Sequence, residues 1–570
     1  MFVISALLFI AVLARVAWLQ TAQADDLRHA GRAQRTTESV LRASRGTIFA
    51  RDGGELAISV PVSTLIANPK LITDPAGTAQ VLAQLLQLSP EKQQSLAVAF
   101  AAKEKSFVYV ARQIDDELAG SVLALNLPGV DSIREDKRIM PSGAAGRSLL
   151  GRTDPDGVGT AGLEMQYNDL LTGVDGERVR EHDRDGRSIP GSGATTTEPV
   201  SGDDLVLTID RSMQYQVEQA LLKRVNDLVA RGGTAIVMDT QTGEIYAAAN
   251  VRRGDDGVVQ VTSANLAAVE AYEPGSVAKV FSIAAALDAG TATPDSVFAV
   301  PGKMTFDKDT EFEFTITDAY PHATEPMTVR DILVHSSNIG TLMTAQQLGA
   351  ERLGSYLELF GFGKTTGLDF PGESGGIMKP ADKWQGTEKV TVSYGYGFSA
   401  TSLQLIAGVN TVANGGVYVA PKLVKSTIDS TGTVIDTPPS ATHQVLAPDT
   451  ASAMTSLLRD VVCSGTATRA QIPGISVAGK TGTGYKLQEN GTYEGADGQR
   501  AYFATFVGFL PADNPRVTIL VSIDEPDPTT QDRFGGTAAA PVFADLATTA
   551  IHELQLTPSP GDTGCPRPTS

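Results

Sequence analysis

Ser276 and Lys279 carry a hydroxyl and an amine that could together form and break an acyl bond. They follow the turn-forming pair Pro274 and Gly275 and precede the apolar run 280–287, so we predict that Ser276 opens a helix. Positions three apart on a helix face the same side. Burial lowers the pKa of a lysine, and a neutral amine beside a hydroxyl can activate it as a nucleophile. Alone, the pair is better explained as an N-cap serine and a surface lysine.

A second short motif lies further along the chain. Ser336 and Asn338 flank Ser337 and form a Ser-x-Asn sequence. The amide of Asn338 can donate a hydrogen bond to a substrate carbonyl, and the hydroxyl of Ser336 can relay a proton. These are groups that an acyl-transfer site needs beside its nucleophile.

A third motif reads Lys480, Thr481, Gly482, Thr483, and we expect it to form a strand. Alternation in a strand puts Thr481 and Thr483 on one face, where two hydroxyls and a cation suit a carboxylate. The same alternation puts Lys480 on the opposite face. Gly482 has no side chain, so another backbone segment can approach it closely.

In order and spacing, the three motifs resemble those of the penicillin-binding transpeptidase family. Residues 395–404 look like the family's G-x-G-x-x-x-T-x-L-Q segment, and residues 207–210 look like the strand that opens its transpeptidase domain. Residues 45–48 and 162–164 resemble the N-terminal module of class B members. Residues 45–53 depart from the family's usual R-G-x-I-x-D-R-N-G.

The resemblance implies a set of site residues and their roles. The catalytic residues would be Ser276, Lys279, Ser336, Asn338 and Lys480, and the substrate-binding residues Thr481, Gly482 and Thr483. Ser276 would be acylated, with Lys279 as base or, alternatively, Ser336 with Lys480. Backbone N–H groups of Ser276 and Thr483 would hold the oxyanion. By the resemblance alone, the amine of Lys480 enters the site.

The resemblance also implies a biological role. The first 200 residues are too short for a glycosyltransferase domain plus pedestal, which favours class B, and Ser336-Ser337-Asn338 looks like the division-type, FtsI-like version. The expected partners are peptidoglycan stem peptides ending in D-Ala-D-Ala, β-lactams, an FtsW-like glycosyltransferase and other divisome proteins. The alternatives are a β-lactamase and a non-enzymatic β-lactam sensor.

Local patterns predict the elements around the motifs. Residues 234–238 and 244–248 predict one hairpin, residues 502–510 and 517–523 a second, and the chain between them is mostly helical. From the hairpins we expect an antiparallel sheet with helices on its faces, in a mixed α/β (α+β) fold class. The resemblance implies the penicillin-binding transpeptidase and serine β-lactamase-like fold, with a helical subdomain beside the sheet and an elongated mixed pedestal and an N-terminal membrane helix before it. The expected limits are 1–20 anchor, 21–200 pedestal, 201–556 transpeptidase domain and 557–570 disordered tail.

The first residues are apolar: residues 1–14 contain no charge, and Arg15 and Trp18 can lie at a membrane interface. A cleaved signal peptide is the alternative, because residues 22–24 form an A-x-A site. Both imply export, and we favour a single-pass anchor in a bacterial cell membrane with the catalytic domain outside the cytoplasm. The arginine-bearing segment 25–51 is expected to be a solvated, mostly helical stalk.

The composition of the chain argues against several classes of ligand. The formal net charge is −19 and the pI about 4.8, so a nucleic-acid partner is not expected. The histidines do not cluster and no CxxC pair exists, so we expect no metal and no cofactor.

Cys463 and Cys565 could pair in an exported protein and pin the tail, or remain free thiols. The polar loop 484–500 follows the Lys480 strand and is expected to be mobile and to lie at one end of the site cleft. It either tunes the rate without supplying catalytic groups or is an uninvolved surface loop.

Overall fold

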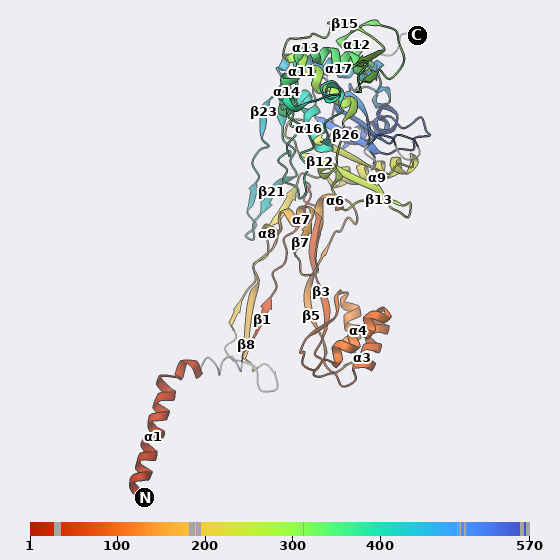
Figure 1. Cartoon of the computed structure of the whole chain (residues 1–570). Coiled ribbons are helices and arrows are strands. Elements are labelled where there is room, and N and C mark those ends of the chain that lie inside the picture. The colour runs from red at the N-terminus through yellow and green to blue at the C-terminus, as the bar shows by residue number, and fades with distance from the viewer. Residues whose placement is uncertain are drawn as a thin grey trace.

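The protein is elongated, with an isolated N-terminal helix at one end and a six-stranded sheet with its helices toward the other (Figure 1). The structure, a computed structural model, describes residues 1–27, 36–181, 189, 195–311, 313–486, 488, 492–494, 498–558, 562 and 564–565. The N-terminal helix α1 (Phe2–Thr21) is 20 residues long and has no buried residue. At 1.5 Å per residue it spans about 30 Å, the thickness of a hydrocarbon core. Among the described residues, it is the one helix long and apolar enough to cross a membrane.

Residues 24–27 are helical, but from residue 36 the pedestal forms strands rather than the expected helical stalk. β1 (Thr36–Leu41) pairs antiparallel with β8 (Gly176–Glu181), which pairs with β9 (Thr195–Thr197). The helical prediction for this segment is therefore wrong over residues 36–51, and residues 28–35 lie outside the described residues. The reason is tertiary: Arg45 is only 8% exposed, and its guanidinium binds the fully buried Glu164 at 2.6 Å.

A seven-stranded sheet joins the pedestal to the rest of the chain. Its order is β22-β21-β10-β2-β3-β4, with β5 also paired to β3. β10 (Asp204–Leu207) lies between β2 (Ile48–Phe49) and β21 (Val424–Ile428), so residues distant in sequence share one sheet. The other members are β3 (Glu55–Ala67), β4 (Val108–Ile114), β5 (Val130–Ile139) and β22 (Val434–Asp436).

The tip of the pedestal has its own small core. The helices α3 (Pro75–Leu85), α4 (Pro90–Ala101) and α5 (Asp116–Leu123) pack there around residues such as Leu82 and Phe100. The upper pedestal instead shares the main core and contains α6 (Arg147–Leu150), β6 (Arg152–Thr153), β7 (Gly159–Ala161), α7 (Gly162–Gln166) and α8 (Asn168–Leu171).

A six-stranded sheet is antiparallel, as expected, with order β13-β12-β11-β26-β25-β24. Both predicted hairpins are present: β11 (Gly232–Asp239) pairs with β12 (Ile245–Arg253), and β25 (Tyr502–Leu510) pairs with β26 (Val517–Asp524). The outer strands are β13 (Val259–Val261) and β24 (Ala478–Tyr485). α9 (Arg211–Asp227) and α18 (Ala540–Glu553) pack together on this sheet, and α16 (Ser402–Ala413) packs on β11, β25 and β26. Every residue of β11 and β26 is buried, so both faces are covered.

A helical region lies beside the sheet (Figure 1). Its helices are α11 (Ala278–Asp288), α12 (Val329–Val334), α13 (Asn338–Leu348), α14 (Ala350–Leu359) and α17 (Pro448–Ser464). Short pieces complete the chain: α10 (Leu266–Val269), β14 (Ala271–Tyr272), β15 (Val297–Val300), β16 (Lys303–Phe306), β17 (Phe314–Thr317), β18 (Glu325–Thr328), α15 (Glu388–Thr391), β19 (Ala400–Thr401), β20 (Val417–Val419) and β23 (Thr442–Gln444).

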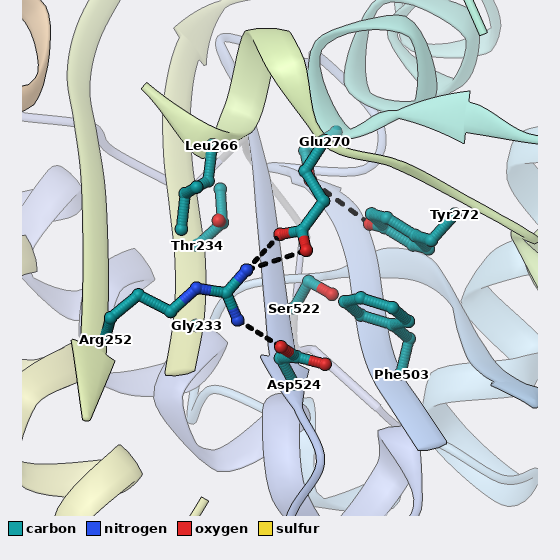
Figure 2. Close-up of a pocket in the computed structure, with 10 residues that line it drawn as sticks. Gly233, Thr234, Arg252, Leu266, Glu270, Tyr272, Phe503, Ser522 and Asp524 are labelled. Atoms are coloured by element: carbon teal, nitrogen blue, oxygen red, sulfur yellow. Dashed lines mark hydrogen bonds and ion pairs between the residues drawn. The ribbon is translucent and has the colours of Figure 1, made fainter. Parts of the chain in front are cut away.

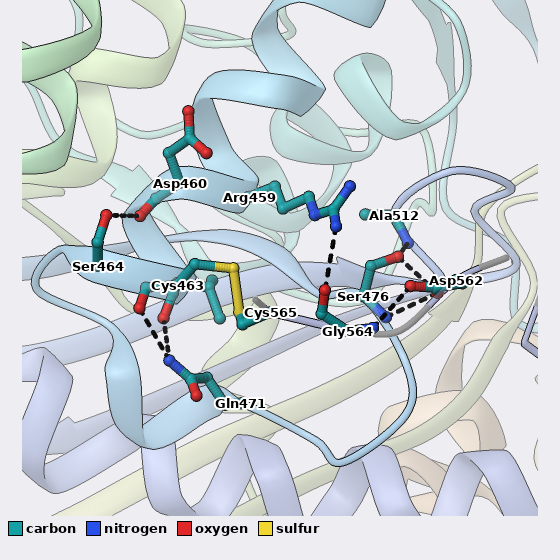
Figure 3. Close-up of a disulfide and its surroundings, with 11 residues drawn as sticks. Arg459, Asp460, Cys463, Ser464, Gln471, Ser476, Ala512, Asp562, Gly564 and Cys565 are labelled. Atoms are coloured by element: carbon teal, nitrogen blue, oxygen red, sulfur yellow. Dashed lines mark hydrogen bonds between the residues drawn. A yellow bond between two sulfur atoms is a disulfide. The ribbon is translucent and has the colours of Figure 1, made fainter. Parts of the chain in front are cut away.

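A disulfide joins Cys463, near the end of α17, to Cys565 in the C-terminal tail (Figure 3). The pairing that the sequence left open is thus confirmed. Next to it, Asp562 accepts hydrogen bonds of 2.8 Å from the backbone N–H and the hydroxyl of Ser476, and Arg459 donates to the carbonyl of Gly564 at 3.0 Å. The sequence predicts a disordered tail over residues 557–570. Of these, residues 559–561, 563 and 566–570 lie outside the described residues.

Candidate active site

Ser276 lies in a short 3-10 turn, η1 (Gly275–Val277), that leads directly into α11. The predicted helix is therefore present, with Ser276 two residues before its regular part. Gly275 has φ +52°, and a Cβ there would lie 2.8 Å from the carbonyl oxygen of Thr483. Only glycine fits this conformation and this contact, so the turn is held against β24.

Lys279 is completely buried in the first turn of α11. Its Nζ donates to the side-chain oxygen of Asn338 at 2.7 Å, to the hydroxyl of Ser336 at 3.1 Å and to the carbonyl of Ser336. Burial holds the pKa of Lys279 well below its usual value, and the nearby amine of Lys480 lowers it further. A lysine in this state can be neutral and can accept a proton.

Ser336 stands between two amines. Its hydroxyl lies 3.1 Å from Lys279 Nζ and 2.9 Å from Lys480 Nζ. Its φ of +59° is uncommon for a residue with a side chain and aims the hydroxyl between the two lysines. Lys480 is also fully buried, and burial lowers its pKa to about 7. The sequence motifs are thus brought together as a chain of groups that can exchange protons.

Asn338 is the first residue of α13, and both the oxygen and the nitrogen of its side-chain amide form hydrogen bonds. Its Oδ1 accepts from Lys279, and its Nδ2 donates to the carbonyl of Thr317 at 2.8 Å. Because Nδ2 carries two hydrogens, it could donate the second one to a substrate carbonyl.

The edge of the sheet faces the serine turn. β24 is the last strand in the sheet order, and it contacts η1. The carbonyl of Thr483 accepts from the hydroxyl of Tyr396 at 3.2 Å, so it points away from β25. The N–H and C=O of one strand residue point to the same side, so the N–H of Thr483 also faces the free edge. It is placed to meet an oxygen bound beside Ser276.

Lys480 and Gly482 occupy the face of β24 that the alternation rule assigns to them. A Cβ at Gly482 would lie 2.8 Å from the carbonyl of Pro274 and 2.7 Å from Val277, so the expected close approach is confirmed. The long side chain of Lys480 reaches Ser336 along this same face. Strand alternation did not predict this, because it takes no account of a helix start packed on that side.

Thr481 and Thr483 lie on the other face, and their hydroxyls already have protein partners. Thr481 Oγ1 lies 2.7 Å from Thr466 Oγ1, and Thr483 Oγ1 accepts from the N–H of Gly535 at 3.2 Å. Thr481 is only 7% exposed, whereas Thr483 is half-buried. Thr483 is therefore the more accessible of the two to a bound carboxylate.

The loop after β24 reaches back toward the serine. Within its described residues, the hydroxyl of Tyr493 donates to Glu273 Oε2 at 2.6 Å, and Glu273 Oε1 accepts from the N–H of Gly397 at 2.8 Å. Burial raises the pKa of Glu273, which is three residues before Ser276. The loop thus borders the site. The sequence also predicts that this loop is mobile. Residues 487, 489–491 and 495–497 of the loop lie outside the described residues.

A small cavity of about 10 Å³ lies elsewhere on the sheet, lined by Arg252, Glu270, Tyr272 and Asp524 among others (Figure 2). Arg252 binds Glu270 at 2.6 Å and also contacts Asp524. The cavity has room for about one water, and no residue of the three motifs lines it. Within the described residues, no cluster of three or more histidine, cysteine or acidic side chains could hold a metal ion.

Comparison with known proteins places this geometry in a family. The model of the penicillin-binding protein transpeptidase domain matches residues 233–548, and that of the penicillin-binding protein dimerisation domain matches residues 40–207. The chain belongs to the penicillin-binding protein transpeptidases. The order of the two domains confirms the class B resemblance and the fold expected from the sequence.

Relatives of this penicillin-binding protein match over nearly its whole length. Penicillin-binding protein PbpB of Mycolicibacterium smegmatis is 33% identical over 95% of this chain and 88% of its own. Peptidoglycan D,D-transpeptidase FtsI of Escherichia coli is 30% identical over 97% of this chain and 91% of its own. The crystal structure of a peptidoglycan synthetase from Bifidobacterium adolescentis aligns with a TM-score of 0.72 at 28% identity, covering 93% of this chain and 99% of that one.

Sequence reasoning missed several residues of the site. Asp318, Thr466 and Tyr396 contact the motif residues but stand at no recognisable spacing from them. Tyr396 lies within the family-like segment 395–404, which could have indicated it. Nothing in the sequence indicated the other two.

Proposed function

We propose that this chain is a membrane-anchored peptidoglycan D,D-transpeptidase that cross-links stem peptides through an acyl-enzyme on Ser276. One observation carries the proposal: two buried lysine amines flank the hydroxyl of Ser336, and the amine of Lys279 lies one turn after Ser276. A buried, neutral amine beside a serine at a helix start is the arrangement that activates a hydroxyl for acyl transfer.

Acylation uses Lys279 as the base. Its neutral amine takes the proton of Ser276, and the serine oxygen attacks the carbonyl carbon of the penultimate D-Ala. The oxyanion is held by the N–H groups of Ser276 and Thr483, and such donors contribute about 2.7–4 kcal/mol each. The terminal D-Ala leaves as its nitrogen takes a proton, which Ser336 can relay from Lys480 because its hydroxyl contacts both amines. The alternative base is Ser336 acting with Lys480.

The donor's terminal carboxylate binds near the Lys480 motif. Lys480 supplies a nearby amine, and Thr483 is the accessible hydroxyl. The hydroxyl of Thr481 is hydrogen-bonded to Thr466, so Thr481 contributes to the carboxylate site by holding its neighbours in place. Gly482 has no side chain, which lets β24 lie against the serine turn. An amine from a neighbouring peptidoglycan strand then attacks the acyl carbon and forms the new amide. The proton that this amine loses passes through Ser336 to Lys480, and Lys279 returns its proton to the released Ser276.

Named relatives support the substrate and inhibitor classes. Stage V sporulation protein D of Bacillus subtilis is 30% identical over 97% of the chain, in line with the FtsI match. Structures of penicillin-binding protein 3 from Mycobacterium tuberculosis complexed with aztreonam and with ampicillin align with TM-scores of 0.69 and 0.70 at 28% identity. We therefore assign β-lactams as acylating inhibitors of Ser276, and septal cell-wall synthesis with an FtsW-like glycosyltransferase and other divisome proteins as the setting.

The membrane arrangement follows from the same proposal. α1 anchors the chain as a single span, and the catalytic domain lies outside the cytoplasm, where peptidoglycan and an oxidising environment that maintains the Cys463–Cys565 disulfide are found. The proposed limits remain 1–20 for the anchor, 21–200 for the pedestal, 201–556 for the transpeptidase domain and 557–570 for the tail.

Intact-mass analysis after penicillin treatment tests the function. We expect one stable covalent adduct per chain, and none in Ser276→Ala. No adduct on the wild-type chain would refute the proposal. Rapid turnover of a chromogenic β-lactam without a lasting adduct would indicate a β-lactamase instead. An adduct without any cross-linking of stem peptides would indicate a β-lactam sensor.

A further inference from the structure

Asp318 lies beneath the Ser-x-Asn motif and accepts four hydrogen bonds. Oδ1 accepts from the backbone N–H groups of Asn338 at 2.6 Å and Ile339 at 3.1 Å. Oδ2 accepts from the hydroxyl of Ser337 at 2.6 Å and faces Nε2 of His322 at 3.0 Å. The carboxylate therefore caps the start of α13 and fixes the backbone that carries Asn338. Its side chain is only 4% exposed.

His322 compensates the charge of Asp318. Its Nδ1 lies 2.7 Å from the carbonyl oxygen of Ala323, and its Nε2 lies 3.0 Å from the carboxylate of Asp318. Because a carbonyl and a carboxylate both accept, this arrangement favours the imidazolium form, in which both ring nitrogens donate. Asp318 raises the pKa of His322 through this hydrogen bond, and Glu325, 3.4 Å from Nδ1, adds to the effect.

The Asp318 segment also touches the catalytic residues themselves. The neighbouring residue, Thr317, accepts from Asn338 Nδ2, and Asn338 Oδ1 accepts from Lys279. The charged groups that act on Lys279 are Lys480, which lowers its pKa, and Asp318, which raises it. Tyr320, whose pKa is raised by burial and then by Asp318 and Glu325, also belongs to this segment.

We propose that Asp318 and His322 are a positioning pair for acylation, which holds Asn338 against Lys279 and sets the net charge beside that amine. The role rests on the proposed function, because it needs Lys279 to act as the base. Neither residue contacts the reacting atoms. Both act through Asn338 and through their charge on Lys279.

The first test is Asp318→Asn, assayed by the second-order rate of acylation by a fluorescent penicillin across pH. Its amide cannot accept all four hydrogen bonds, so we expect the plateau rate to fall about tenfold, equivalent to about 1.4 kcal/mol. Removing the negative charge lowers the pKa of Lys279 further, so the acidic limb of the profile should move to lower pH. A loss of stability alone would not move that limb.

The second test is His322→Gln, which keeps a donor toward Asp318 but removes the positive charge. Asp318 then acts on Lys279 uncompensated, so the acidic limb should move to higher pH, opposite to Asp318→Asn. If Asp318→Asn fails to unfold cooperatively, this variant decides the question. Asp429→Asn is the matched control, because Asp429 also accepts several hydrogen bonds but lies in an exposed turn beside β22, so its profile should equal that of the wild type.

The outcomes separate the two proposals. An acidic limb that does not move in either variant, with plateau rates within twofold of wild type, overturns the positioning role. Shifts in opposite directions support it. Absence of any labelling of the wild-type chain refutes the proposed function instead, because it removes the acylation that the pair is inferred to assist.

Discussion

Replacing Lys279 with arginine keeps a positive charge but removes a group that can become neutral, since a guanidinium stays protonated at any working pH. Lys279 is fully buried, and its Nζ contacts Asn338 Oδ1 at 2.7 Å and Ser336 Oγ at 3.1 Å. The variant can retain hydrogen bonds to these acceptors, but it cannot take the proton of Ser276.

The expected loss follows from the role of a base. General acid–base catalysis contributes about 100- to 10,000-fold, so acylation should fall by that factor, equivalent to about 2.7–5.4 kcal/mol in the barrier. The pH profile gives a second measure. Burial lowers the pKa of Lys279, so the neutral form predominates above that lowered value and wild-type acylation rises as the pH rises through it. In Lys279→Arg this limb should disappear.

The assay is the rate of fluorescent-penicillin labelling, measured with thermal unfolding on the same samples. Lys422→Arg is the matched control, because the amine of Lys422 also donates to carbonyl oxygens, those of Pro438 at 2.9 Å and Thr437 at 3.4 Å, far from the three motifs in sequence. The control should label at the wild-type rate. If a folded Lys279→Arg protein acylates within a few-fold of wild type, Lys279 is not the base, and the alternative of Ser336 with Lys480 takes its place.

Three further predictions concern the nucleophile, the disulfide and the pedestal. Ser276→Ala should abolish labelling and leave the unfolding temperature nearly unchanged; full labelling of that variant would exclude this serine. The denatured, unreduced protein should contain no free thiol, and replacing Cys463 and Cys565 with serine should lower the free energy of unfolding by about 2–4 kcal/mol; two free thiols would contradict the pairing. Glu164→Gln leaves the guanidinium of Arg45 buried without its carboxylate, so the free energy of unfolding should fall by about 3–5 kcal/mol in a denaturant titration, and an unchanged midpoint would refute that reading.

The site could be predicted from the sequence where its geometry is local. Ser276 and Lys279 are three residues apart on one helix start, and the 502–510 and 517–523 hairpin follows from alternation and a short turn. The direction of the Lys480 side chain needed the resemblance, because strand alternation describes a backbone and not what packs against it.

Non-local contacts could not be predicted. The arginines of residues 25–51 indicated a solvated helix, but Arg45 is buried against a glutamate more than a hundred positions away. Asp318 reaches the start of α13 from across a loop, and no periodicity marks such a cap. The Cys463–Cys565 bond was one of two alternatives, since two cysteines fix a possible pair but not its proximity.

The sheet in which β10 lies between β2 and β21 connects the upper pedestal to the catalytic domain. Ile48 of β2 and Leu205 of β10 belong to the same continuous core as the strands around the site. A close-packed core transmits displacement rather than absorbing it. The upper pedestal and the catalytic domain are therefore expected to move together, so that a tilt of the upper pedestal would reorient the catalytic serine in space and leave its internal geometry unchanged.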